Sequence, residues 1–177
     1  MKNFKYILTI LFFTLFSSTA YSESKIAVLD VVKLLKESKA AISMKDQLNT
    51  VAKKYTDDDQ KKQKEIQKQE EELLRQKATL TPEAFSDRKN TFEKKVIEFN
   101  KKSQAKRKAL AKAERDAVTQ IEDEVEKVVK AIIDSDKITA VFRKSAIILG
   151  DTSIDITEKV VVELNKKLSA VTVKVTP

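Results

Sequence analysis

Apolar positions are concentrated in two short blocks, and a long polar segment separates them. In the first block, residues 25–29 (KIAVL) form a run rich in β-branched side chains, which predicts a buried strand. Asp30 follows and can cap a short helix, because its carboxylate accepts hydrogen bonds from first-turn amides. In the second block, residues 138–142 (ITAVF) and 146–149 (AIIL) predict two more strands. Residues 155–168 (DITEKVVVELNKKL) predict a closing helix, since D-I-T-E has the spacing of a capping box.

The segment between the blocks, residues 38–134, has the composition of helix. It is rich in Lys, Glu and Gln and contains no glycine and a single proline, Pro82. Proline is tolerated at the first position of a helix, and Thr81 before it is a suitable cap. We therefore expect one helix to end and another to begin within residues 80–85, which gives an antiparallel hairpin. The alternative interpretation is one long helix with a kink at Pro82.

The spacing of large apolar residues supports the hairpin. Three of them precede the proline at steps of seven, three follow it at the same step, and folding the chain at Pro82 pairs them so that the two residue numbers add up to 165. These six predicted seam residues are Ile66, Leu73, Leu80, Phe85, Phe92 and Phe99. The same register joins Tyr55 to Leu110 and Met44 to Ile121, where the step is 11. The pattern thus predicts a thin antiparallel coiled coil.

Two apolar residues of the hairpin, Leu74 and Ile97, lie outside this register. They are interpreted either as partly buried on the flank of the hairpin or as an apolar surface that faces a binding partner.

The fold class is therefore α+β and mostly α, with a small sheet body and a long hairpin arm. The body consists of residues 23–37 and 135–177, and the arm consists of residues 38–134. A body of about 60 residues lies near the lower limit for an independent core, and a three-stranded sheet has unpaired edges. We expect oligomerisation to complete the body.

The first 22 residues have the features of a signal peptide. Lys2 and Lys5 precede an 11-residue apolar run, residues 6–16, and Ala20 and Ser22 fit a small-x-small cleavage pattern. The alternative is an uncleaved anchor, but a spanning helix needs about 20 residues. No cysteine follows the run for lipid attachment. The mature chain is expected to begin at Glu23 and to be exported and soluble.

The composition excludes most catalytic and cofactor chemistry. The chain has no cysteine, no histidine and one glycine, so thiolate catalysis, histidine-based catalysis and a glycine-rich phosphate loop are absent. A Ser-Lys or paired-carboxylate enzyme would need an apolar pocket that charged helices do not provide. We predict neither an enzyme nor a cofactor or metal site.

Basic charge is concentrated in one stretch of the arm. Residues 94–115 carry nine basic and two acidic side chains, whereas the whole chain has a net charge of +8. Such a stretch is often only the solvated face of a helix. The functional alternative is attraction to acidic proteins or anionic lipid; nucleic acid is disfavoured by export and by the lack of interleaved aromatic residues. The candidate residues for binding clients or anions are Leu74, Ile97, Lys101, Lys102, Lys106, Arg107 and Lys108.

The layout resembles the Skp (OmpH-like) family of periplasmic chaperones. The resemblance rests on KIAVLDVVKLL near the start, the lysine-rich hairpin and DITEKVVVELNKKL near the end, in that order after a signal peptide. It implies a periplasmic homotrimer whose three arms enclose a cavity and hold unfolded outer-membrane proteins without ATP. The sequence FRKSAIILGDTSID departs from the family pattern, because its second strand is more apolar. Two other interpretations stay open: an exported structural coiled coil, and a protein that binds anionic lipid or lipopolysaccharide.

Overall fold

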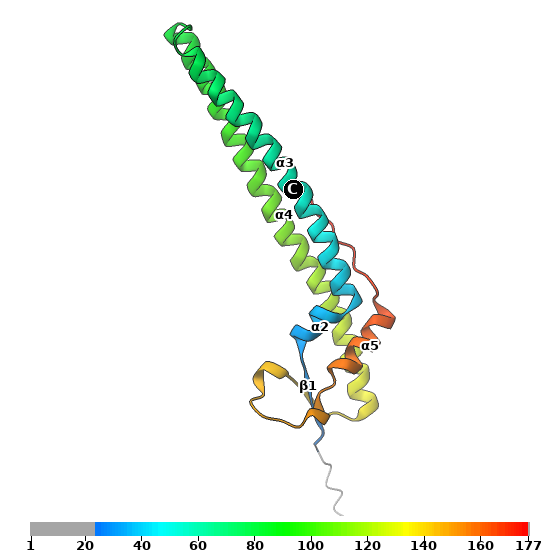
Figure 1. Cartoon of the computed structure of the whole chain (residues 1–177). Coiled ribbons are helices and arrows are strands. Elements are labelled where there is room, and N and C mark those ends of the chain that lie inside the picture. Colours follow the sequence, from blue (N-terminus) through cyan, green and yellow to red (C-terminus); the bar gives the residue numbers. More distant parts are fainter. Residues whose placement is uncertain (1–23, 177) are drawn as a thin grey trace, which may run out of the picture.

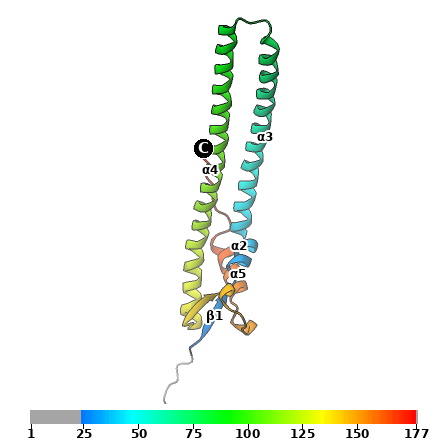
Figure 2. The same ribbon diagram turned by 90° about the vertical axis from the view of Figure 1, so that its left-hand side faces the viewer.

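The computed structural model describes residues 24–176 and shows a long helical hairpin that rises from a small body (Figures 1 and 2). The elements are, in chain order, β1 (Ile26–Leu29), α2 (Val31–Glu37), α3 (Lys39–Gln76), α4 (Pro82–Asp136), β2 (Ala140–Arg143), the 3₁₀ turns η2 (Lys144–Ala146) and η3 (Thr152–Ile154), and α5 (Thr157–Lys167). The mostly helical α+β class and the hairpin are confirmed. The predicted signal peptide lies outside the described residues.

The hairpin turns where the proline predicts it. The Thr81 hydroxyl accepts a hydrogen bond from the Ala84 N–H at 3.3 Å, and Pro82 occupies the first turn of α4 with Glu83 beside it. Helix α3 ends at Gln76, and residues 77–81 form the tip. The kinked single helix is therefore wrong.

The two strands of the sheet are parallel, and the whole hairpin is the connection between them. Ile26 pairs with Ala140 and Leu29 with Arg143 at the ends of the ladder. Parallel strands need a long crossover connection, which α2, α3 and α4 supply. The strand order is therefore compatible with an arm inserted between the two parts of the body.

The prediction of a third strand at residues 146–149 is wrong, because these residues do not form a strand. The turn η2 bends the chain away from β2, and the Ile147 N–H donates to the Lys144 carbonyl at 3.1 Å. The free edge of β1 instead meets Asp155, which forms an isolated bridge with Val28. Within the described residues, the predicted strand finds no ladder partner, and its Ile148 and Leu149 are 96% and 92% exposed.

Strand β2 begins two residues later than predicted because α4 ends in a left-handed turn. Lys137 has φ 54°, and the N–H of Ile138 donates to the Ile133 carbonyl at 3.0 Å. This wrapped helix end is a Schellman-type termination. Ile138 is thereby buried against α4 instead of joining the strand.

The core lies where the base of the hairpin meets the body. Its fully buried side chains include Leu34 of α2, Ile121 and Val128 of α4, and Val160 and Leu164 of α5. The buried cluster extends along α4 as far as Ala117 and along α3 to Ala40 and Ala41. The base of the arm therefore shares one core with the body, while the division at residues 38 and 134 stays a prediction.

Candidate functional site

The upper arm has a seam in which apolar and polar side chains alternate. All six predicted seam residues are half-buried, as are Gln69 and Gln76. Lys95 Nζ donates to Gln69 Oε1 at 3.1 Å, and Arg88 donates to Gln76 Oε1. The residue numbers of both polar pairs add up to 164, one less than the predicted register. The six-residue apolar pairing itself stays a prediction.

An acidic residue fixes the middle of the arm. Asp59 accepts hydrogen bonds from Ser103 Oγ and Lys106 Nζ, both at 2.7 Å. The ammonium of Lys106 also lies 5.1 Å from the centre of the Tyr55 ring, within the range of a cation–π contact. The bond from Lys106, together with the bond from Ser103, holds the pKa of the Asp59 carboxyl below its ordinary value.

Small residues form the lower seam of α4. Ala109, Ala113, Ala117 and Ile121 are buried at steps of four, whereas Leu110 is only half-buried. Small side chains allow two helix backbones to approach closely. The prediction for this region used only large apolar residues, so it found Ile121 and missed the three alanines.

The two apolar candidates outside the register are on the surface. Leu74 of α3 is 63% exposed and Ile97 of α4 is 66% exposed. Burial on the flank of the hairpin is therefore slight for both. They place apolar side chains on the distal part of the arm, where a bound chain can contact them.

The five basic candidates, which we call the basic cluster, differ in their surroundings. The cluster is Lys101, Lys102, Lys106, Arg107 and Lys108. Lys106 is held in the seam by Asp59, and Lys102 pairs with Glu98 at 2.6 Å one turn away. Lys101, Arg107 and Lys108 are exposed, and no ion pair within the described residues engages them. The free positive charge of the cluster therefore comes mainly from these three.

An apolar groove lies at the base of the arm. It has a volume of about 1110 Å³, and its apolar lining comes from α2, α3 and α4. These lining residues are Val32, Leu35, Ala41, Ile42, Met44, Leu48, Ala52, Leu110 and Ala111. Arg107 of the basic cluster also lines it. Sequence periodicity could not find this groove, because it depends on how α2 crosses the hairpin.

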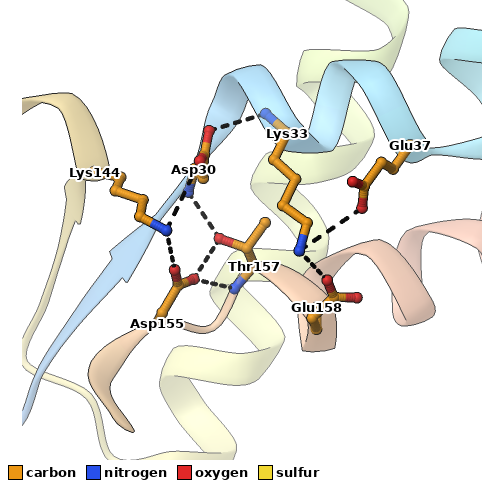
Figure 3. A network of polar contacts seen from close by, with 7 residues as sticks. All are labelled: Asp30, Lys33, Glu37, Lys144, Asp155, Thr157 and Glu158. Carbon is orange, nitrogen blue, oxygen red and sulfur yellow. Dashed lines mark hydrogen bonds and ion pairs between the residues drawn. The ribbon is translucent and has the colours of Figure 1, made fainter. Parts of the chain in front are cut away.

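A polar network joins the two parts of the body (Figure 3). Its members are Asp30, Lys33, Glu37, Lys144, Asp155, Thr157 and Glu158. The Asp30 carboxylate caps α2 by accepting from the Lys33 N–H at 2.9 Å, which confirms the predicted cap. The Asp30 N–H donates to Thr157 Oγ1 at 2.8 Å. The start of α2 is thus tied directly to the start of α5.

Asp155 does not cap α5 as a capping box predicts. The helix begins at Thr157, and the Asp155 carboxylate accepts from the Thr157 N–H at 2.9 Å and from Lys144 Nζ at 2.8 Å. Glu158 instead pairs with Lys33 of α2. Both acidic residues therefore act between elements, because the chain turns at Ile156 before the helix begins.

The environment of Asp155 strongly favours its charged form. Burial alone raises the pKa of the carboxyl, but the hydrogen bonds from Lys144 and Thr157 outweigh burial and lower the pKa to about 2. The residues of the network form hydrogen bonds and ion pairs with one another, and these contacts hold the two parts of the body together (Figure 3).

Within residues 24–176, no three acidic side chains gather so that they could hold a metal ion. No helix in that part of the chain has the length and apolarity needed to cross a bilayer.

The fold defines a helical-hairpin protein with a small α/β body, and comparison with known proteins gives its family. Residues 25–164 match the family described as Outer membrane protein (OmpH-like). The chain therefore belongs to the OmpH-like (Skp) family of outer-membrane-protein chaperones, which in general are not enzymes.

A solved structure has the same fold. It is a protein of Caulobacter crescentus CB15 described as a candidate outer membrane chaperone (OmpH-like). The two chains are 16% identical, the alignment covers 88% of this chain and 92% of that chain, and the TM-score is 0.81. No curated protein sequence matches the chain significantly.

Proposed function

We propose that this protein is an ATP-independent holdase that binds unfolded outer-membrane proteins in the periplasm and prevents their aggregation. The observation that carries the proposal is that the long arm of this chain, a member of a chaperone family, exposes apolar side chains. Leu74 and Ile97 provide this surface on the distal arm, and the groove provides more at the base. Binding of the unfolded client competes with its aggregation by mass action.

The exposed apolar residues are separated from one another, which suits a holdase. Each contact is weak, and several arms that act on one client chain give avidity without a deep pocket. Release then requires no ATP, because individual contacts break readily. The cluster's free charges, Lys101, Arg107 and Lys108, attract acidic clients and an anionic lipid or lipopolysaccharide surface, and salt weakens this attraction.

The functional form is a homotrimer. The body exposes apolar side chains that a single chain leaves uncovered: Ile26 on β1, Phe142 on β2, and Ile148 and Leu149 after η2. The sheet has only two strands, and sheet edges are normally covered or paired. Association of three bodies would bury these residues.

A refolding experiment tests the proposal. An unfolded outer-membrane protein is diluted from urea with and without the mature chain, and turbidity reports aggregation. Multi-angle light scattering measures the mass of the chaperone alone. A trimer that keeps the client soluble without nucleotide supports the proposal.

Other outcomes point to other functions. A monomer with no effect on turbidity supports an exported structural coiled coil. Binding to anionic liposomes without any effect on aggregation supports a lipid-binding protein.

A further inference from the structure

A short segment beyond α5 has the pattern of a strand without forming one. Residues 169–176 run up alongside the lower part of the hairpin (Figures 1 and 2) and follow the region that matches the family, residues 25–164. Val171 is buried and Val173 and Val175 are half-buried, whereas the residues between them are exposed. This is the alternation of a half-buried strand, yet the segment joins neither strand of the sheet.

The side chain of Gln47 on α3 takes the place of a partner strand. Its Nε2 donates to the Val171 carbonyl at 2.7 Å, and its Oε1 accepts from the Val173 N–H at 3.2 Å. A carboxamide carries a donor and an acceptor side by side, as a peptide group does. Ser43, one turn earlier, accepts from the same Nε2 through its Oγ at 3.1 Å, which orients the amide.

The contacts of Gln47 involve only the backbone of the segment. They therefore do not depend on which side chains the segment carries, provided that the residue in the place of Val173 has an N–H. The side chains of Val171 and Val173 pack on the core cluster, and this packing favours apolar side chains at these two positions of a bound segment. A backbone clamp combined with sites for alternate side chains is how proteins recognise extended peptides.

We propose that Gln47 and the part of the core cluster on which Val171 and Val173 pack, together called the seat, form a binding site for extended segments with alternating apolar side chains. Residues 169–176 occupy this site in cis. Strands of outer-membrane barrels alternate in this way. The inference rests on the proposed function for the identity of the ligand, which is a strand-forming segment of an unfolded client. The tethered segment is present at an effective concentration on the order of millimolar, so a client segment must displace it.

Fluorescence anisotropy with labelled peptides tests the site. One peptide has the sequence of residues 169–176, and a second has the same composition with its three valines adjacent. The proteins are the mature chain, a variant that ends at Leu168, and that variant with Gln47→Ala. The matched control is the shortened variant with Gln60→Ala, since Gln60 is an exposed glutamine of α3.

The shortened variant should bind the alternating peptide about tenfold or more tightly than the mature chain does, because its seat is open. Gln47→Ala should abolish most of this gain, and Gln60→Ala should keep it. Equal affinity of the mature and shortened chains overturns the proposal, as does equal binding of the two peptides.

A second variant covers the case in which the shortened chain does not fold. Val173→Pro in the mature chain removes the N–H that donates to Gln47 and releases the segment without deleting it. It should also bind the alternating peptide more tightly than the parent, and no gain overturns the proposal. The peptide assay involves no aggregation, so its failure in a chain that still suppresses turbidity overturns this inference and leaves the holdase function standing. Peptide binding in a chain that does not suppress turbidity overturns the holdase function and leaves the peptide site standing.

Discussion

Replacing Asp155 with Asn should remove most of the stability that the body gains from the Lys144 ion pair, while the shape of the side chain is kept. The asparagine oxygen can still accept from the Thr157 N–H, but it cannot pair with the Lys144 ammonium 2.8 Å away. The pKa of Asp155 falls from 3.8 to about 2 in the folded chain. Each unit corresponds to about 1.4 kcal/mol, so the fall of about two units means that the charged form contributes at most about 2.5 kcal/mol near pH 7.

The sign of the pH dependence follows from the lowered pKa. The contribution is complete above the unfolded pKa of 3.8 and is lost as the pH falls through about 2. Urea unfolding at fixed protein concentration should therefore give a difference of up to about 2.5 kcal/mol between parent and Asp155→Asn at pH 7. The difference should shrink between about pH 4 and pH 2.

Two controls sharpen this experiment. Asp57→Asn, at an exposed position of α3, should change stability by less than about 0.5 kcal/mol. Lys144→Met in the Asp155→Asn background should cost little more than Asp155→Asn alone, because the shared interaction is already lost. A stability difference that stays constant from pH 7 to pH 2 would refute the claim that the charged form of Asp155 stabilises the body.

Three further predictions follow from the arm and the body. Thr81→Ala should lower hydrogen-exchange protection in the first turn of α4 and leave the body unchanged, since the cap is local; loss of protection throughout the chain would contradict this. Ile148→Ser combined with Leu149→Ser should leave the far-ultraviolet circular dichroism intact but reduce the light-scattering mass to that of a monomer; an unchanged trimer mass would refute the role of these residues in association. Changing the exposed cluster members Lys101, Arg107 and Lys108 to Gln should slow client capture in stopped-flow fluorescence at low salt and have little effect at high salt. Equal low-salt rates in variant and parent would contradict that role.

The sequence predicts the arm well because its signals are local. A cap residue, a proline at the first helical position and a steady apolar period each act over a few residues, so the turn at Thr81–Pro82 is found where expected. The strand of residues 146–149 is predicted wrongly for the opposite reason. An apolar run gives the propensity for a strand but not its partner, and within the described chain Asp155 occupies the edge of β1.

The polar contacts of the arm and body also could not be derived from the sequence. Gln69, Gln76 and Asp59 look like solvated residues on charged helices, and only the packing of α3 on α4 makes them part of the seam. The Gln47 clamp likewise joins residues far apart in the chain. For Leu74 and Ile97 the sequence leaves partial burial and exposure open, and the structure shows that both are exposed. The sequence does not reveal that Lys106 is held by Asp59.

The central claim is that the arm holds an unfolded client through its exposed apolar residues. Site-specific photo-crosslinking tests it most directly, with a photoreactive residue placed at Leu74 or at Ile97 of the mature chain. On mixing with an urea-unfolded outer-membrane protein, both positions should form adducts with the client, whereas the same client folded in detergent micelles should form none. Absence of adducts at both positions, in a chain that still suppresses client aggregation, would contradict the claim.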